Sequence, residues 1–231
     1  ADSAQRTTNT DFTFSGTVND TNALQSLVIT ATKGGLDQGE VFSTGAPGGW
    51  TYTVALPNDG SKDGEWEYTI TATDVAGRAT DETRRVLIDE TVPSTPVIDP
   101  FPGDYQDAEV VASGSASDGG SGLQTVEYSF DESSWYPATG TVNWYKTIDI
   151  DGGGDETLGE GSHTLYVRGI DRAGNVSSVA SRPFTVDRSD PQLTINGYDG
   201  VVYRGQTFTI DGTVDDSLAL PASPLTVTVT D

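Results

Sequence analysis

Acidic residues at repeated spacings are the side chains of this sequence most suited to chemistry. Asp20, Asp118 and Asp216 each follow a glycine by four residues, and successive Gly-x-x-x-Asp segments are 98 residues apart. Asp74 and Asp171 each open an Asp-x-Ala-Gly segment. Carboxylates that are brought together repel one another unless a cation neutralises them. Calcium is the cation we expect, because it accepts about six to eight oxygen ligands in flexible geometry.

The remaining candidate ligands lie in two joints of the pattern Val/Ile-Asp-x-x-x-Pro, at residues 88–93 and 186–191. Proline fixes its own backbone and favours an extended residue before it, so each joint is predicted to be a stiff linker. A repeated linker indicates a repeated domain. The candidate ligands in the joints are Asp89, Glu90, Asp187 and Asp190.

Alternating apolar residues predict the β-strands that must position these acids. The expected strands of the first repeat cover residues 12–16, 27–31, 50–56, 66–74 and 79–88. Those of the second cover 97–98, 110–113, 126–130, 144–150, 163–171 and 179–186, and those of the third 193–195, 208–212 and 225–229. No helix is expected, and residues 1–10 are expected to lack regular structure. The pattern predicts an all-β chain of tandem immunoglobulin-like antiparallel β-sandwiches in an elongated rod.

The period also sets the expected domain boundaries. Residues 1–90 would form domain 1 without its leading strand, and residues 91–188 would form a complete domain 2. Residues 189–231 would be the truncated start of domain 3. We therefore expect the chain to be a piece of a longer array.

The net charge of -23 argues against two classes of partner. An excess of acids over bases this large disfavours binding to nucleic acid or to an anionic membrane. No apolar segment is long enough to span a bilayer. The chain has no cysteine, which removes disulfides and thiolate chemistry. The same charge has an alternative interpretation, an acidic surface that only keeps the protein soluble.

Strand order predicts that distant acids meet at one joint. In a seven-stranded sandwich, the loop after the second strand and the loop before the last strand lie at the end where the chain enters. Asp118, Asp171 and the joint acids Asp89 and Glu90 would therefore converge. The other candidates would form an incomplete second site, Asp187, Asp190 and Asp216, and half a site, Asp20 and Asp74. In the alternative interpretation, each aspartate only accepts hydrogen bonds within its own turn.

Three further features point to weaker possibilities. Asp149–Glu160 partly matches an EF-hand loop, with acids at several ligand positions and a glycine at the central turn. The single histidine, His163, takes the strand position of Trp66, which indicates packing; no catalytic motif occurs, so we expect no enzyme activity. Solvent-facing aromatic rings can stack on sugars, and a cluster of them lies in the second repeat at Trp135, Tyr136, Trp144 and Tyr145.

The order and shared spacing of the joints, the Gly-x-x-x-Asp segments and the Asp-x-Ala-Gly-Asn segment resemble those of bacterial Ig-like repeats of giant surface adhesins. The resemblance covers residues 11–231. It implies extender repeats of the calcium-dependent RTX or biofilm-adhesin type, exported to the cell surface and often stiffened by calcium between domains. Arg78 in place of Asn175, and Arg188 in place of Glu90, depart from the pattern and predict unequal calcium affinity at the joints.

Together these features predict a monomeric spacer of a secreted or surface-anchored bacterial protein. Its partners would be neighbouring repeats of the same longer chain, and any glycan or host-surface ligand would bind elsewhere in the parent protein. A calcium ion would bridge Asp89 to Asp118 and Asp171 and make the joint rigid. Two alternatives stay open: a carbohydrate-binding or accessory module of a secreted enzyme, and an acidic spacer without a specific metal.

Overall fold

The computed structural model is all-β and contains immunoglobulin-like antiparallel sandwiches, as the sequence predicts. It describes residues 6–103, 105–107, 109–150, 158–196, 205, 209–216 and 218. Within these residues, no helix is long and apolar enough to cross a membrane. Two compact units are distinguished. The first comprises residues 1–99, 112–146 and 165–182, and the second comprises residues 100–111, 147–164 and 183–231.

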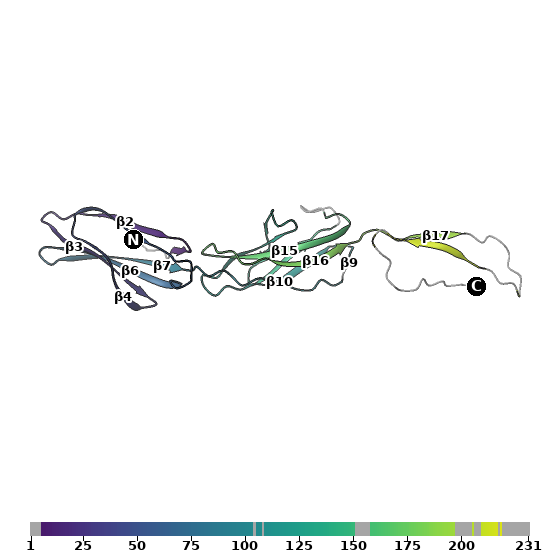
Figure 1. Ribbon diagram of the computed structural model, residues 1–231, viewed down its shortest axis with the longest axis horizontal. Helices are drawn as coiled ribbons and strands as arrows, with labels where there is room; N and C mark the ends of the chain where they lie inside the picture. Colours follow the sequence, from purple (N-terminus) through teal and green to yellow (C-terminus); the bar gives the residue numbers. More distant parts are fainter. Residues whose placement is uncertain are drawn as a thin grey trace. The chain divides into compact units, whose positions relative to one another are not determined.

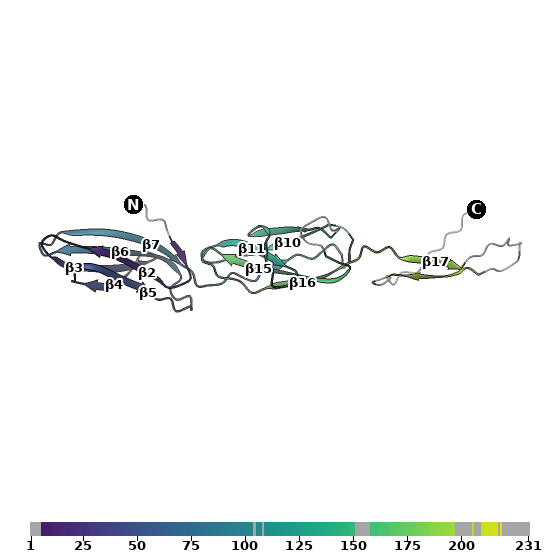
Figure 2. The same ribbon diagram turned by 90° about the horizontal axis from the view of Figure 1, so that it is seen from above.

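Two facing sheets form the sandwich at the start of the first unit. The larger sheet has the strand order β1-β7-β6-β3-β4, and the smaller pairs β2 with β5. The β2–β5 sheet lies over the larger sheet (Figure 1, Figure 2). The strands are β1 (Arg6–Thr8), β2 (Phe12–Val18), β3 (Leu24–Lys33), β4 (Leu36–Thr44), β5 (Gly48–Val54), β6 (Gly64–Asp74) and β7 (Ala79–Ile88).

The core of this sandwich consists of the inward-facing residues of both sheets. Phe12 of β2 and Val54 of β5 are buried with Ile29, Tyr68 and Val86 of the larger sheet. The Phe12 and Tyr68 rings meet edge to face, with centroids 6.1 Å apart. Because side chains alternate between the two faces of a strand, each strand contributes every second residue to the core. The strand ends at Asp74 and Ile88 are fixed by this packing.

The strand pattern returns in the next repeat. One sheet has the order β13-β14-β10-β8, and the other has the order β12-β11-β15-β16-β9. A further antiparallel pair joins β17 to β18. The strands are β8 (Val97–Ile98), β9 (Tyr105–Gln106), β10 (Val110–Ser115), β11 (Leu123–Ser129), β12 (Tyr136–Pro137), β13 (Thr139–Gly140), β14 (Asn143–Ile148), β15 (Gly161–Asp171), β16 (Ala180–Val186), β17 (Gln192–Asn196) and β18 (Asp211–Asp215).

The structure corrects the strand prediction in several places. Residues 6–8, within the stretch expected to lack regular structure, form β1, which pairs in parallel with β7, with Thr8 opposite Ile88. β4, β9, β12 and β13 were not expected either, because these segments are short or lack alternation and depend on their neighbouring strand for pairing. Residues 208 and 225–229, expected in strands, lie outside the described residues. The domain boundaries stay a prediction.

Candidate metal centre

Three carboxylates from separate elements meet within the first unit. Asp89 directly follows β7, Asp118 lies in the loop after β10, and Asp171 is the last residue of β15. One oxygen of each carboxylate lies within 4.8 Å of the other two. Asp89 and Asp171 are 1% and 0% exposed, and Asp118 is half-buried. The structure therefore brings together three of the four acids that strand order predicted to meet.

Asp89 forms hydrogen bonds with the backbone groups of three other residues. Its own N–H donates to the Thr8 carbonyl at 3.0 Å. Its carboxylate accepts the Ser121 N–H on Oδ2 at 2.6 Å and the Thr91 N–H on Oδ1 at 3.2 Å. A Cβ added to Gly120 would collide with this carboxylate, so only glycine fits there. Asp89 is thus fixed against the loop that carries Asp118.

Asp118 has one oxygen bound and one oxygen free. Its Oδ2 accepts the N–H groups of Gly120 at 3.0 Å and Gly122 at 2.7 Å, which shapes the loop. Its Oδ1 is buried and has no hydrogen-bond partner in the structure. A buried acceptor without a partner costs free energy. A cation would satisfy this oxygen.

Asp171 organises the turn that follows β15. Its Oδ1 accepts the N–H groups of Gly174 at 2.7 Å and Asn175 at 2.8 Å. Gly174 has a φ of 99°, a left-handed conformation that favours glycine and allows this tight turn. The Asn175 side-chain amide donates to Asp171 Oδ2 at 2.7 Å. Three hydrogen bonds to one carboxylate therefore hold this turn together.

Asn175 also ties this turn to the joint. Its Nδ2 lies 2.8 Å from the carbonyl oxygen of Asp89 and 3.2 Å from that of Thr91. Its Oδ1 accepts the side-chain amide of Asn9 at 2.9 Å. The amide connects the segment before β2, the joint and the β15 turn. It carries no net charge, so it does not balance the three acids.

Charge in the described part of the chain leaves this cluster unbalanced. The ion pairs found there involve other acids, at Asp74, Glu82, Glu67, Glu127 and Glu160. Two carboxylate charges within 4.8 Å of each other repel by at least roughly 3 kcal/mol at an effective dielectric constant of about 20. Three close acids, one of them with an unpartnered buried oxygen, fit a divalent cation. The all-oxygen set fits a hard ion such as calcium.

Asp20 and Asp74 occupy the turns of the preceding repeat that correspond to those of Asp118 and Asp171. Their hydrogen-bond partners differ from those of the cluster. Asp20 Oδ1 accepts the N–H groups of Asn22 at 2.8 Å and Ala23 at 3.1 Å. Asp74 Oδ2 accepts Arg78 Nε at 2.7 Å in an ion pair. Hydrogen bonds from the backbone and then the side chain of Arg78 lower the pKa of Asp74. Both acids line an open cavity of about 640 Å³.

Glu90 does not join the cluster, contrary to expectation. Its Oε1 accepts the Asn58 N–H at 2.5 Å, and its backbone N–H donates to Asp63 Oδ1 at 2.7 Å. Thr91 Oγ1 donates to the other oxygen of Asp63 at 2.6 Å. The side chain therefore turns to the loop that precedes β6. Spacing alone could not distinguish the directions of two adjacent acids.

The second joint repeats the backbone contacts of the first but carries its own cation. The Asp187 N–H donates to the Gln106 carbonyl at 3.0 Å, as Asp89 does to Thr8. The Arg188 N–H donates to Glu160 Oε2 at 3.0 Å, and its Nη1 donates to the Ile150 carbonyl at 2.6 Å.

The structure does not gather the three predicted ligands of that joint, Asp187, Asp190 and Asp216, into one site. Within the described residues, none of them belongs to a group of three acids whose oxygens lie within 4.8 Å of one another.

The minor candidates have plain structural roles where they are described. His163 Nε2 lies 2.7 Å from the Gly159 carbonyl oxygen, as Trp66 Nε1 donates to the Lys62 carbonyl at 2.7 Å. This matches the packing interpretation of the histidine. Within Asp149–Glu160, residues 151–157 lie outside the described residues, so the EF-hand-like loop stays a prediction.

The aromatic cluster does not form one exposed platform. Trp144 is 2% exposed and belongs to the core. The Arg168 guanidinium lies over the Trp135 ring, 4.1 Å from its centroid. Tyr136 and Tyr145 are each 49% exposed. The two tryptophans therefore pack against protein groups.

Asn175, Asn9 and Gly120 complete the site and were not among the predicted ligands. For Asn175, the sequence offered one indication of a role in the site, namely that the equivalent turn of the preceding repeat has Arg78 at this position. Nothing in the residues before β2 pointed to Asn9. Its contact depends on a packing arrangement that spacing does not encode.

No curated protein matches this chain. Solved structures with similarity include the fibronectin(III)-like modules of Clostridium thermocellum CbhA, at 18% identity over 79% of this chain and 88% of that one, with a TM-score of 0.39. A 1.5-MDa bacterial ice-binding adhesin matches at 19% identity over 81% of this chain and 62% of that one, with a TM-score of 0.37. A tetra-tandem repeat from the extending region of a large adhesion protein matches at 21% identity over 90% of this chain and 53% of that one, with a TM-score of 0.35.

These structural similarities are weak, and nothing about the role of this chain follows from them. The match to a protein family is confined to the first repeat. The strand order and buried core of this repeat are those of an immunoglobulin-like sandwich. Residues 1–90 match the family described as bacterial Ig-like domain, which supports a bacterial Ig-like repeat in this part of the chain.

Proposed function

We propose that this chain is a spacer segment of a secreted or cell-surface bacterial protein, and that a calcium ion stiffens the joint between its repeats. The ion would be held by Asp89, Asp118 and Asp171. The observation that carries the proposal is the meeting of these three carboxylates within 4.8 Å. The bacterial Ig-like match of residues 1–90 supports the spacer role.

The origin of the three acids supports a mechanical role. They come from the end of β7, the loop after β10 and the end of β15. An ion bound to all three would fix the residue that follows β7 relative to the loops of the next repeat. Without the ion, the same carboxylates repel and favour a more open joint. Calcium binding thus makes a bendable connection stiff.

Calcium fits better than magnesium for two reasons. The oxygens belong to loops and strand ends of irregular geometry, which calcium tolerates and magnesium does not. Several of these oxygens already accept backbone hydrogen bonds, so the donor set is partly preorganised. A preorganised all-oxygen set lowers the cost of binding a hard cation.

Calorimetric titration of the full chain with calcium tests the metal site. We expect saturable binding that is lost in Asp118→Asn, because this change removes one of the three charges and leaves the loop bonds largely in place. Asp59→Asn is the matched control: Asp59 also accepts a loop N–H, from Ser61 at 2.9 Å, and lies outside the cluster. Equal binding by wild type and Asp118→Asn would contradict the assigned ligands.

Small-angle scattering with and without chelator tests the stiffening. Calcium should narrow the distribution of dimensions for wild type and leave Asp118→Asn unchanged. Calcium binding with an unaltered scattering profile would contradict the mechanical role but keep the metal site. A melting temperature that rises with bulk salt concentration and does not change with micromolar calcium would instead indicate an acidic spacer without a specific metal.

A further inference from the structure

We propose that β1 is a latch whose closure on β7 is coupled to occupation of the acid cluster, and that Asn9 is the positioning residue that carries the coupling. The inference rests on the proposed function, because it takes the cluster of Asp89, Asp118 and Asp171 to bind calcium. β1, the joint and the turn after β15 all belong to the first unit. The end of β1 contacts both of the other segments.

β1 is short and has few pairs of its own. Its three residues, Arg6–Thr8, pair in parallel with Val86, Leu87 and Ile88 of β7. It lies at the end of its sheet, so β7 is its one strand partner in the described part of the chain. Local opening costs least free energy in short terminal segments with few buried contacts. Contacts just beyond the end of β1 therefore decide how firmly it stays closed.

Asp89 takes part both in the pairing of β1 with β7 and in the acid cluster. Its N–H donates to the Thr8 carbonyl at 3.0 Å, one residue beyond the end of β7. Asp89 is 1% exposed, and its carboxylate lies in the cluster. Thr8 is 5% exposed, and its hydroxyl donates to the Thr10 carbonyl at 3.0 Å. A ligand that holds the Asp89 carboxylate therefore also holds the N–H group that closes β1.

Asn9 ties the end of β1 to the turn that carries Asp171. It directly follows β1, it is half-buried, and its Nδ2 donates to Asn175 Oδ1 at 2.9 Å. The same Nδ2 is the atom nearest to a Cβ placed on Gly174 of this turn, at 3.8 Å. β1 is thereby connected to the metal centre by a second contact, to which the Asp89 N–H does not contribute.

The contact with Asn9 also fixes which way the Asn175 amide faces. Its Nδ2 donates to the carbonyls of Asp89 at 2.8 Å and Thr91 at 3.2 Å, and to Oδ2 of Asp171 at 2.7 Å. Its Oδ1 accepts the donor of Asn9. If the amide turned over, its oxygen would face three acceptor oxygens and its NH₂ group would face another donor. Asn9 thus holds the joint and the Asp171 turn in the arrangement that the cluster requires.

Closure of β1 and occupation of the cluster should support each other. When β1 opens, Asp89 loses its bond to Thr8 and Asn175 loses its donor. The three carboxylates are then less preorganised, so the open form binds a cation more weakly than the closed form. A ligand that prefers one form shifts the equilibrium toward it by the same factor. Occupation of the cluster therefore closes β1, and closure of β1 strengthens binding.

Release of β1 would change the edge of the larger sheet. The backbone groups of β7 that now pair with β1 would then lie at a free edge. A free edge accepts strands from other chains and favours aggregation. The latch therefore keeps this edge covered where calcium is plentiful and uncovers it where calcium is scarce.

The second joint supplies an internal reference. Its Asp187 N–H donates to the Gln106 carbonyl at 3.0 Å, directly beyond the parallel pairing of β9 with β16. In the described residues, Asp187 belongs to no group of three acids with oxygens within 4.8 Å of one another. The residue one period after Asn9 is Asp107, which is exposed. The same backbone bond is thus present at both joints, and in the described structure only the first is linked to an acid cluster.

Amide hydrogen exchange of the full chain, followed by NMR with calcium and with chelator, tests the coupling. We expect calcium to slow exchange at β1 and at Asp89 by about tenfold or more, and to leave the Asp187 amide unchanged. Calorimetric titration of the same sample records whether calcium binds. Asp118→Asn should lose both the binding and the slowing, although it leaves Asn9 and β1 unaltered.

Asn9→Ala tests the positioning residue. The variant keeps all three carboxylates, so calcium should still bind, but the ratio of exchange rates at β1 without and with calcium should fall toward one. If Asn9 had only a structural role, both rates would change alike and their ratio would stay as in wild type. Asn22→Ala is the matched control, because Asn22 is an exposed asparagine of the same repeat outside the cluster.

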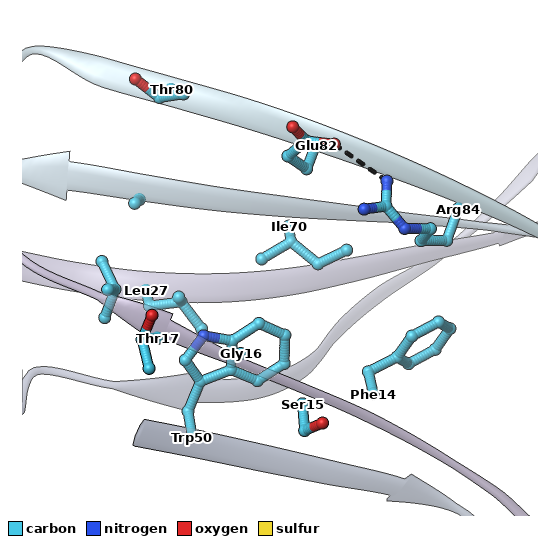
Figure 3. A pocket seen from close by; sticks show the side chains of 12 residues that line it. Phe14, Ser15, Gly16, Thr17, Leu27, Trp50, Ile70, Thr80, Glu82 and Arg84 are labelled. Carbon is cyan, nitrogen blue, oxygen red and sulfur yellow. Dashed lines mark hydrogen bonds and ion pairs between the residues drawn. The ribbon is translucent and has the colours of Figure 1, made fainter. Parts of the chain in front are cut away.

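Arg84→Gln separates the coupling from a general loss of stability in β7. Figure 3 shows the Arg84 guanidinium paired with Glu82, at 2.9 Å. Both residues lie on β7 before the segment that pairs with β1. This variant should keep the wild-type ratio of exchange rates.

The outcomes distinguish failure of the latch from failure of the metal site. Calcium binding without slower exchange at β1 would overturn the latch and keep the metal site. An unchanged ratio of exchange rates in Asn9→Ala would overturn the role of Asn9, and with it the proposal. Absence of calcium binding in wild type would overturn the latch together with the proposed function.

Discussion

Two turns of the same Asp-x-Ala-Gly type give their aspartates different partners. Asp74 receives the side chain of Arg78, a cation four residues later, whereas Asp171 receives the neutral amide of Asn175. The Asn175 amide also reaches the backbone of the joint. One residue type thus decides whether the acid is balanced within its own turn or depends on a partner from outside.

The comparison explains why only one of the two turns belongs to an acidic cluster. Asp171 meets Asp89 and Asp118, while Asp74 is engaged by the guanidinium beside it. Asp74 needs no metal ion to balance its charge, because the Arg78 guanidinium belongs to the same turn. The neutral amide of Asn175 leaves the negative charge of Asp171 available to a cation.

The largest effect that separates the two turns should come from Asp171→Ala at saturating calcium. The change removes three accepted hydrogen bonds at a fully buried site and one proposed ligand. We expect the free energy of unfolding to fall by about 3 kcal/mol, measured by urea denaturation. Asp74→Ala should cost less, because Arg78 is largely solvated. A larger loss of unfolding free energy for Asp74→Ala than for Asp171→Ala would contradict this difference between the two turns.

The second prediction converts one turn into the other. Asn175→Arg places a guanidinium where Arg78 stands in the preceding repeat, so the cluster would carry its own cation. Calcium affinity should fall by about tenfold or more, measured by calorimetric titration. Asn175→Gln is the control, because it keeps an uncharged amide. Unchanged affinity in Asn175→Arg would show that charge balance does not govern the site.

The reverse change should have a smaller effect. Arg78→Asn removes an ion pair whose arginine side chain is 72% exposed, so the loss of stability should be at most about 1 kcal/mol. It should not create a calcium site, because the described residues offer Asp74 no cluster of three acids. Thermal melting with and without calcium checks both statements. A new calcium response would mean that two acids suffice.

The smallest effect concerns pH. The pKa of Asp74 lies below its ordinary value of 3.8, because hydrogen bonds from Arg78 favour the charged form. This carboxylate therefore stabilises the fold above pH 3.8, and the contribution is lost as the pH falls through the lowered pKa. Acid unfolding of Arg78→Asn should begin from lower stability and show a slightly shallower loss than wild type, because the variant keeps the backbone hydrogen bond of residue 78 and loses the side-chain one. A steeper loss than in wild type would contradict this assignment.

Much of the framework was readable from the sequence. Period-two alternation located β7 at residues 79–88, and the repeated joint located the residue after it. Strand parity then predicted that Asp89, Asp118 and Asp171 would meet, because adjacent strands of a sandwich alternate in direction. These features depend on local patterning and on chain topology, which a sequence encodes directly.

Other features depended on contacts between segments distant in sequence. β4 lacks regular alternation and is a strand because β3 pairs with it. Glu90 turns away from the cluster because loop amides are offered to it on the other side.

The two Asp-x-Ala-Gly turns make the same distinction. Asp74 and Asp171 share one motif, yet within the described residues only Asp171 belongs to a cluster of three acids. Sequence determined which residues could bind or pair, because residue type sets charge, size and backbone freedom. Tertiary structure decided which of them do, because the free energy of a contact depends on which partner the fold brings within a few ångströms.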